Sequence, residues 1–495
     1  MAFTDRLHNR GSISDGYDVE YSLKLDAGRA EYLLSEGRTQ GDSQQKWTYS
    51  TWFKRSEFSY TGEPYQNLFC AGTSTSNYCH AYFRADGSYP DNELFIYLDN
   101  GGSQYWFGRT QHEFRDTSAW YHLVIAVDTT LSTANDRVKV YVNGELQSID
   151  NRTNPTQNAS TRVGDGGGKF AIGAIPGNTY QFNGYIAECV LADGYQYAPT
   201  KFGKFDTNNV WVPIDVSALA VGGTGFYMNF DDSSNLGKVQ QSNNQGNFSK
   251  YNITSVDQAT DTPTNSFCIL NHSSKTNGNV KISRAGTYAS TDGGSGWCSI
   301  NATHAVSKGK WYWEVLFYND PGDTNTVMIG VAGTNDPWIP HRAGGYYLGN
   351  VTTGASIGWY FVNGNLYNDA SYGDISGPNY GNICMLALDM DNLKFYQGIN
   401  GTWATPTGGT QQNPASGTNG VNLASAFTGV SGGTDYIVPS FSIYQGNRVE
   451  GINFGGYYSE TLSSAAQDAN GYGNFEYAPP SGFYSLCTKN IAEFG

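Results

Sequence analysis

One segment of this sequence alternates apolar and polar residues and then ends in Asn-Gly. Residues 137–147 read RVKVYVNGELQ, so three valines fall on one face of a strand and the polar side chains fall on the other. Asn143 and Gly144 tolerate the positive φ angles of a type I′ turn, whose twist matches that of the flanking strands. The segment predicts a half-buried β-hairpin.

The same pattern of an alternating strand followed by Asn-Gly occurs again in the second half of the chain. Residues 392–403 read NLKFYQGINGTW, with Asn400 and Gly401 at the expected turn. A glycine inside a strand often marks a bulge, and we expect one at Gly398. Two hairpins so far apart favour two β domains built on similar lines.

The composition favours the same class of fold. Of 495 residues, 15% are aromatic, only 15% are charged and 61 are glycine, which is typical of strands joined by many turns. The best helical candidate is short: residues 462–471, LSSAAQDANG, with serine at the start as the N-cap and glycine at the end. We therefore predict an all-β chain of antiparallel β-sandwiches.

The distribution of strand-like segments suggests where the domains begin and end. Such segments fill residues 22–231 and resume in residues 267–495, with a short N-terminal arm, 1–21, before the first. Residues 232–266 are polar and poor in aromatic residues, so we expect a linker there. The prediction is two sandwiches joined by a polar linker.

The charge and the cysteine content indicate which binding partners and which cellular compartment to expect. The chain has 29 basic and 44 acidic residues, a net charge of −15, and no basic cluster, which argues against nucleic acid as a partner. No apolar stretch approaches eighteen residues, so neither a signal peptide nor membrane insertion is expected. The seven cysteines are odd in number and lack CxxC spacing. We expect free, mostly buried thiols and folding in a reducing cytoplasm.

Motifs of catalysis are incomplete. GASIG at 354–358 has the spacing of a serine-hydrolase elbow, but a strand follows Ser356 where a helix is required. GDGGGKF at 164–170 lacks the first glycine and the hydroxyl residue of a phosphate loop. Glycosidases need two flanking carboxylates, and no such set is present. Glu188 and Glu314 are isolated acids in apolar strands, and we interpret Glu314 as a structural hydrogen-bonding group. The chain is therefore expected not to be an enzyme.

Several motifs in order carry a resemblance to known families. WTYSTWFKR, WYHLVIAVD and DRVKVYVNGELQ follow the strand order of laminin-G-like, concanavalin-A-type jelly rolls, so residues 22–231 resemble that family. GKWYWEV, IGVA, LALDMDNLKFYQGING and GINFGG resemble the strands of a SPRY domain, which would occupy residues 267–495. The resemblance implies that both sandwiches are of the concanavalin-A-like jelly-roll type.

The combination of these two domains is similar to virion structural proteins of tailed bacteriophages. The resemblance implies a non-enzymatic, tail-associated or fibre-like protein that binds a host surface glycan or receptor. The alternative is a purely structural role, as a capsid decoration or an adaptor. The expected partners are other virion proteins and the host glycan or receptor, in several copies or as an oligomer. The implied location is the virion, assembled in the host bacterial cytoplasm.

A binding site is expected in an aromatic loop of the SPRY-like half. Residues 336–350, DPWIPHRAGGYYLGN, lie between strands, and SPRY domains bind partners through loops at one edge of the sandwich. Aromatic faces stack on sugars and on protein side chains alike. The alternative is that these rings cap the core. The candidate binding residues are Trp338, His341, Tyr346 and Tyr347.

The laminin-G-like resemblance makes calcium the cofactor to consider, because domains of this family often bind it through loop carboxylates and carbonyls. The acids that could contribute ligands are Asp231, Asp232, Asp389 and Asp391, but none of their loops has the pattern of a calcium-binding loop. Solvated turn acids are the favoured interpretation. We assign no metal ligand and no cofactor.

Overall fold

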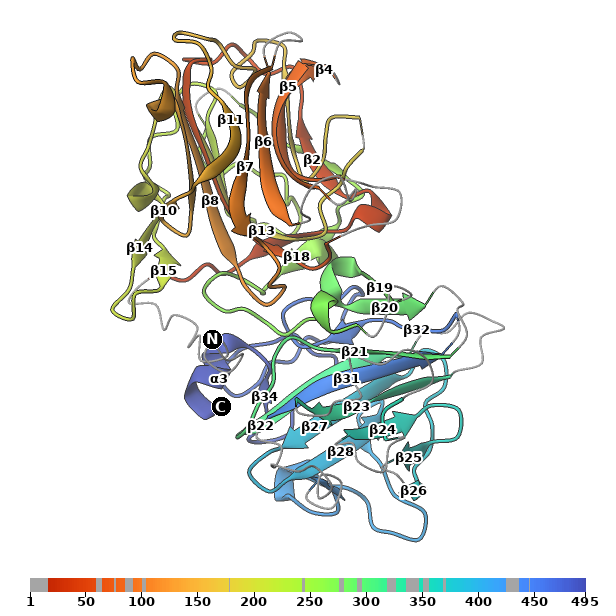
Figure 1. Ribbon diagram of the computed structural model, residues 1–495. Helices are drawn as coiled ribbons and strands as arrows, with labels where there is room; N and C mark the ends of the chain where they lie inside the picture. Colours follow the sequence, from red (N-terminus) through yellow and green to blue (C-terminus); the bar gives the residue numbers. More distant parts are fainter. Residues whose placement is uncertain are drawn as a thin grey trace. The chain divides into compact units, whose positions relative to one another are not determined.

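The structure is a computed structural model in which the chain forms two compact units (Figure 1). The boundary between them in the sequence lies between Thr264 and Asn265. We call them the N-terminal unit and the C-terminal unit. The residues that it describes are 17–58, 65–74, 77–84, 92–99, 104–177, 179–242, 245–275, 280–291, 296–317, 326–334, 347–349, 356–367, 371–423, 436–444 and 446–495.

Two eight-stranded sheets, which we call sheet A and sheet B, build the N-terminal unit. Sheet A has, in spatial order, β10 (Glu145–Leu146), β9 (Val138–Val142), β8 (Tyr121–Asp128), β3 (Lys46–Arg55), β13 (Gly184–Asp193), β1 (Ser22–Leu25) and β18 (Gln258–Ala259), with β16 (Phe226–Met228) beside β13. Sheet B has β11 (Ile149–Thr153), β7 (Gln104–Glu113), β6 (Glu93–Asp99), β5 (Asn77–Arg84), β4 (Tyr65–Ser74), β12 (Lys169–Ile172), β2 (Tyr32–Ser35) and β17 (Ser249–Tyr251). A two-stranded sheet pairs β14 (Gly203–Phe205) with β15 (Trp211–Pro213).

Apolar side chains of both large sheets form one core, with Phe53 and Leu123 from sheet A and Phe83 and Ile96 from sheet B. The N-terminal unit is therefore a β-sandwich, as two half-buried sheets require.

Three sheets build the C-terminal unit. The smallest has β19 (Val280–Ser283), β20 (Tyr288–Thr291) and β32 (Arg448–Val449). A six-stranded sheet has β21 (Trp297–Asn301), β31 (Ile437–Tyr444), β23 (Val327–Gly333), β24 (Ser356–Tyr360), β25 (Asn365–Tyr367) and β26 (Ser371–Asp374). A seven-stranded sheet has β29 (Thr402–Trp403), β28 (Lys394–Ile399), β27 (Ile383–Asp389), β22 (Lys310–Leu316) and β33 (Ile452–Asn453), with β30 (Val421–Asn422) beside β28 and β34 (Tyr484–Ser485) beside β22.

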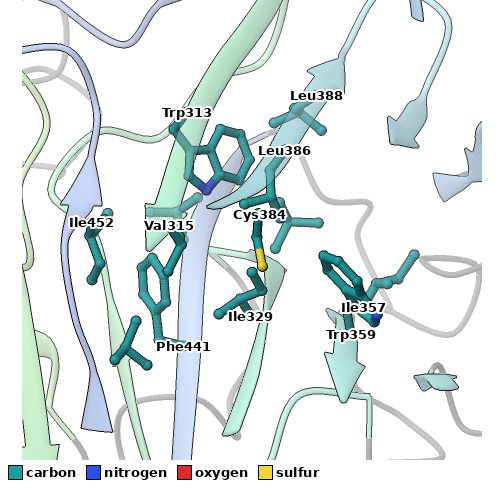
Figure 2. Packing of buried hydrophobic residues seen from close by; sticks show 14 of the residues in the cluster. Trp313, Val315, Ile329, Ile357, Trp359, Cys384, Leu386, Leu388, Phe441 and Ile452 are labelled. Atoms are coloured by element: carbon teal, nitrogen blue, oxygen red, sulfur yellow. The ribbon is translucent and has the colours of Figure 1, made fainter. Parts of the chain in front are cut away.

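The core of the C-terminal unit lies between the two larger sheets. Figure 2 shows Trp313 and Leu386 of the seven-stranded sheet gathered with Ile329, Trp359 and Phe441 of the six-stranded sheet. All of them are buried, so this unit is a second β-sandwich.

Helical structure is sparse in the described residues. The α-helix α3 spans Thr488–Phe494, and the short 3-10 helices are η1 (Ala27–Arg29), η2 (Ala134–Asp136), η3 (Pro199–Lys201), η4 (Ser255–Asp257), η5 (His272–Ser274), η6 (Arg284–Gly286) and η7 (Pro414–Ser416). The helix predicted at residues 462–471 is wrong, because this segment is made of bends and a turn, and Ala466 forms a β-bridge with Phe475. In the part of the chain that the structure describes, no helix has the length and apolar character needed to cross a membrane.

Both Asn-Gly hairpins are confirmed. Asn143 and Gly144 have φ of 49° and 81° between β9 and β10, and Asn400 and Gly401 have φ of 47° and 81° between β28 and β29. Positive φ at both central positions is the mark of a type I′ turn.

The predicted bulge at Gly398 is wrong. Gly398 pairs with Met385 on one side and Trp403 on the other in an unbroken register. A Cβ at this position would lie 2.8 Å from the backbone carbonyl oxygen of Thr402, as well as 2.5 Å from Cε of Met385. The glycine is therefore required by close packing rather than by a bulge.

The predicted linker, residues 232–266, belongs almost entirely to the N-terminal unit. Its residues form β17, which pairs with β2 of sheet B, and β18, which pairs with β1 of sheet A. Three of its side chains enter the sandwich core: Leu236, Phe248 and Ile253. The linker prediction is wrong because edge strands can be polar on most of their surface and still complete a sheet.

Buried ion pairs hold the end of this segment in place. Nζ of Lys24 lies 2.6 Å from Asp257 and 2.7 Å from Glu31, and Nζ of Lys54 lies 2.7 Å from Asp261. The side chains of all five are at most 1% exposed. Removing a charged group from water carries a large desolvation penalty, which is offset only when the group is paired. The acids of the segment are accordingly paired with lysines of β1 and β3.

The end of the predicted N-terminal arm also packs on the N-terminal unit. Of residues 1–21, residues 1–16 lie outside the described residues. Val19 is buried, and its backbone N–H donates to the hydroxyl of Thr264 at 3.1 Å.

All seven cysteines are free and buried, as predicted.

Candidate functional site

Sheet B carries aromatic side chains on the face opposite the sandwich core. On β5, Cys79 and Ala81 point into the core, so their neighbours Tyr78, His80 and Tyr82 lie on the other face. Strands β5, β6 and β7 lie side by side in Figure 1, and β6 and β7 extend the row. The aromatic face, as we call it, consists of Tyr78, His80, Tyr82, Phe95, Tyr97 and Phe107.

The rings of the aromatic face contact one another across the strands. His80 stacks on Tyr82 with ring centroids 4.3 Å apart and 22° between planes. Tyr78 meets His80 edge to face at 4.7 Å, and Tyr82 stacks on Phe95 at 5.4 Å. Phe95 is fully buried, whereas Tyr78 and Tyr97 are partly exposed. The buried rings therefore form a rigid base beneath aromatic surface that solvent can reach.

His80 is fixed in one protonation state and one tautomer. Burial lowers its pKa to about 3, so the imidazole is neutral. The amide of Asn67 donates from Nδ2 to the carbonyl of Tyr180 at 3.2 Å, which directs its Oδ1 toward Nδ1 of His80 at 2.8 Å. Since an amide oxygen can only accept, Nδ1 carries the proton. Nε2 of His80 is left as an acceptor.

The two partly exposed tyrosines add neutral hydroxyl groups. Burial raises the pKa of Tyr78 to about 12, and burial followed by the nearby Asp99 carboxylate raises the pKa of Tyr97. Neither hydroxyl makes a hydrogen bond to another described residue. Both are therefore protonated at neutral pH and able to donate and accept.

Charged groups lie at one end of the aromatic face. Arg109 of β7 forms an ion pair with Glu93, and its Nη2 lies 3.5 Å from Asp150 of β11. Both carboxylates are thus engaged by the same guanidinium. A glycosidase instead needs one carboxyl to donate a proton and the other to attack or to activate water.

This arrangement suits a ligand with an apolar face and polar edges. The partly exposed rings can contact the C–H face of such a ligand, and the hydroxyls of Tyr78 and Tyr97 can hydrogen-bond to its polar groups. Sequence analysis missed these residues. The signal was present in residues 77–84, NYCHAYFR, where the aromatic Tyr78, His80 and Tyr82 alternate with the core residues.

Only one of the sequence-predicted binding residues can be placed. Trp338, His341 and Tyr346 lie outside the described residues. The ring centroid of Tyr347 lies 4.9 Å from that of Trp297 and 6.1 Å from that of Tyr367. Tyr347 packs with them over a small cluster of Met328, Ala332 and Leu348, which is the behaviour expected of a ring that caps the core.

Glu314 of β22 has a structural position. Its carboxyl accepts from the hydroxyl of Tyr312 at 2.8 Å and from the backbone N–H groups of Glu476 and Tyr477 at 2.9 and 2.8 Å. Burial raises its pKa to about 7. The carboxyl ties the segment around residue 476 to the central strand.

Glu188 lies where β13 is irregular. Its φ is 49°, and the register of β13 with β3 shifts between Ala187 and Val190. Its carboxyl accepts from the hydroxyls of Tyr17 at 3.1 Å and Tyr227 at 2.9 Å, and burial raises its pKa to about 7. The neighbouring space, lined by Trp52 and His122 among others, is too small to admit a water molecule, so it is not a substrate pocket.

Ser356 is no exposed nucleophile. It lies buried in β24, and its hydroxyl accepts from the backbone N–H of Gly349 at 3.0 Å. A strand at this point is incompatible with the strand–turn–helix geometry of a hydrolase elbow.

Two of the acids considered for calcium, Asp389 and Asp391, face protein donors. Asp389 is buried 3.1 Å from Nζ of Lys310 and also accepts from Asn392, and Asp391 accepts from the backbone N–H of Gly309 at 2.9 Å. Calcium requires six or more oxygen ligands, and these oxygens already face protein donors. Within the described ranges, no three His, Cys, Asp or Glu side chains are grouped so that they could hold a metal ion.

Comparison with known proteins identifies the fold of the first unit. Residues 27–194, about a third of the chain, match the family model of the concanavalin A-like lectin/glucanases superfamily. A search of curated proteins gives no match.

Solved structures resemble parts of the chain at low identity. The SPRY domain of human HERC1 is 15% identical over 37% of this chain and 93% of its own, with a TM-score of 0.26. The CBM40 of Ruminococcus gnavus IT-sialidase, bound to α2,3-sialyllactose, is 18% identical over 33% of this chain and 88% of its own, with a TM-score of 0.22. A candidate carbohydrate binding protein from Bacteroides ovatus is 16% identical over 47% of this chain, with a TM-score of 0.33, and the chain spans only 58% of its length.

The sheet topology, the core between the sheets and the family match all indicate the same fold for the N-terminal unit. The described chain is all-β, and its N-terminal unit contains a concanavalin A-like β-sandwich that carries the aromatic face on sheet B.

Proposed function

We propose that this protein is a non-enzymatic carbohydrate-binding protein that contacts a glycan through the aromatic face of sheet B. The observation that carries the proposal is the row of rings on the face turned away from the core, with Tyr78 and Tyr97 partly exposed and their hydroxyls not hydrogen-bonded to other described residues. Sugars present a C–H face for stacking and hydroxyls for hydrogen bonds, which is the chemistry this face offers. The match to a lectin and glucanase superfamily supports the same class of ligand.

Binding of the full chain to a glycan array tests this proposal. The informative variants are Tyr78→Ala and Tyr97→Ala, because both rings are partly exposed and neither belongs to the sandwich core. Tyr195→Ala is the matched control. Tyr195 is 38% exposed in the same unit, but its carbonyl accepts from Thr48 of sheet A, so it lies away from the aromatic face.

The expected result is that each aromatic-face variant weakens binding by at least about fivefold, the effect of removing a ring worth about 1 kcal/mol or more at a binding interface. Tyr195→Ala should bind as the unaltered chain does. Glycan binding that is unchanged in both aromatic-face variants contradicts the proposed site, and no binding to any glycan contradicts the proposed function.

We infer further that the setting is a bacteriophage particle and that the glycan or receptor belongs to the host cell surface. The support is the sequence resemblance to virion proteins, together with a net charge of −15, which disfavours nucleic acid as a partner. Single sugar contacts are weak, so several copies on one particle would raise the overall affinity by making later contacts intramolecular.

The test of the setting compares purified protein on host cells with protein on cells stripped of surface polysaccharide. Loss of binding on the stripped cells, with the protein present in purified particles, agrees with receptor binding. Presence in particles without binding to either cell sample favours capsid decoration or an adaptor role instead.

A further inference from the structure

The C-terminal unit has a polar groove beside its Asn-Gly hairpin at residues 400 and 401. The groove has a volume of about 600 Å³ and is lined by residues of β29 and of the segment that follows it: Gly401, Thr402, Trp403, Thr410, Gln411, Gln412, Asn413, Thr418 and Asn419. None of these residues carries a charge, and one of them, Trp403, is aromatic. Eight of the nine are thus small or polar and uncharged, so the surface of the groove is neutral although the chain has a net charge of −15.

Hydrogen bonds within the wall hold the groove in one shape. Gln412 is 2% exposed, and its side chain accepts from the backbone N–H of Gln397 at 2.7 Å and donates to the Gln397 side chain at 3.0 Å. Nδ2 of Asn419 donates to the carbonyl of Gln411 at 2.9 Å. Nε2 of Gln411 donates to the carbonyl of Trp403 at 3.0 Å. The groove is therefore preorganised.

Trp403 has a firm support. It packs against a buried cluster that includes Met385 and Tyr396 and stays partly exposed. A ring fixed from behind can stack on a ligand without losing much conformational entropy on binding.

The wall keeps unused donors and acceptors. Oε1 of Gln411, Nδ2 of Asn413, Oδ1 of Asn419 and the hydroxyl of Thr410 make no hydrogen bond to other residues in the described ranges. Behind them, Nε2 of the fully buried Gln397 also has no hydrogen-bond partner among the described residues. The unused groups include both donors and acceptors, so an occupant that pairs with them must supply both.

We propose that this groove is a second carbohydrate site, one that takes a neutral oligosaccharide. An uncharged sugar supplies hydroxyls that both donate and accept, and its C–H face can stack on the indole of Trp403. A carboxylated or sulfated sugar is disfavoured because no cationic residue lines the groove to neutralise it. The site belongs to a different unit from the aromatic face and stands independently of it.

Saturation-transfer NMR and isothermal titration on the full chain test the proposal. The probes are neutral hexasaccharides of glucose, mannose, galactose and xylose, with a hexasaccharide of galacturonic acid as the charged counterpart. The variants are Trp403→Ala and Thr410→Val. Thr410 is exposed and its hydroxyl forms no hydrogen bond to described residues, so its replacement leaves the fold intact even if Trp403→Ala unfolds. Val362→Ala is the control, since Val362 is 50% exposed in the same unit and does not line the groove.

The expected result is binding of at least one neutral probe, weakened about tenfold or more by Trp403→Ala, as for the central ring of a binding site, and a few-fold by Thr410→Val. Val362→Ala and Tyr97→Ala should leave this binding unchanged, the latter because it reports only on the aromatic face. Binding of the probe should increase the protection from hydrogen exchange within residues 401–419. The proposal is overturned if no neutral probe binds, if binding does not depend on Trp403 and Thr410, or if only the galacturonic acid probe binds.

Discussion

Replacing Gly144 by alanine tests how the first hairpin is held against the rest of the N-terminal unit. Gly144 has a φ of 81°, and a Cβ built there lies 2.4 Å from two carbon atoms of the Trp211 indole. Trp211 is 8% exposed, and its Nε1 donates to Nδ1 of His122 at 3.0 Å. The indole therefore cannot move aside without breaking a buried hydrogen bond.

The size of the effect follows from two separate terms. A left-handed backbone costs an L-residue about 1–2 kcal/mol, and an added carbon forced into a packed site costs about 1–3 kcal/mol more. Gly144→Ala should therefore destabilise the N-terminal unit by about 2–5 kcal/mol. Gly167→Ala is the matched control, because Gly167 has a φ of 74° in the same unit and a Cβ there meets nothing within 4 Å. It should cost only the backbone term.

The assay is hydrogen exchange along a urea series on the full chain, read by mass spectrometry from peptides of β3 and β13. These strands lie at the centre of sheet A, so their exchange reports the unfolding of this unit and not of the other. Equal free-energy losses in Gly144→Ala and Gly167→Ala would refute the packing of Trp211 beneath the turn.

Three further predictions concern the buried charges and the polar C-terminal part of the N-terminal unit. Burial raises the pKa of Glu188 from 4.5 to about 7, so the folded state binds more protons than the unfolded state between these pH values. The stability contributed by Glu188 therefore falls by about 3 kcal/mol as the pH rises through this range. Burial raises the pKa of Glu31 and Glu314 to about 7 as well, so Glu188→Gln should reduce the slope of the stability–pH profile there without abolishing it, and an unchanged slope would contradict the assignment. Asp261→Ala removes the carboxylate facing the buried ammonium of Lys54 and should cost about 3–5 kcal/mol in urea unfolding, with much of the loss recovered in Lys54→Met/Asp261→Leu; a loss below 1 kcal/mol would argue against the buried pair. A fragment that ends at residue 264 should unfold cooperatively in calorimetry, whereas one that ends at residue 235 lacks β17, β18 and both acid partners and should not; equal cooperativity would mean that these strands are dispensable.

The sequence by itself determined the class of fold and its local turns. Alternation in residues 137–147 and 392–403 specifies strands because side chains of a strand point to opposite faces in turn. Asn-Gly specifies the turn between them because few residues adopt positive φ twice in succession. These are short-range properties, and the structure has both hairpins where they were predicted.

Only the tertiary structure decided which residues complete each sandwich and which surface is presented for binding. Residues 232–266 looked like a linker because their stabilising partners, Lys24 and Lys54, lie more than 200 residues away in the chain. Alternation in residues 77–84 predicts a strand with two faces, but both sets of side chains can be buried, so it does not say which face meets the core. The pairing of β5 with β4 and β6 settles this, since it aligns Cys79 and Ala81 with other core residues and leaves the tyrosines on the opposite face. Register and long-range pairing, which no local pattern encodes, thus convert an aromatic strand into a candidate binding face.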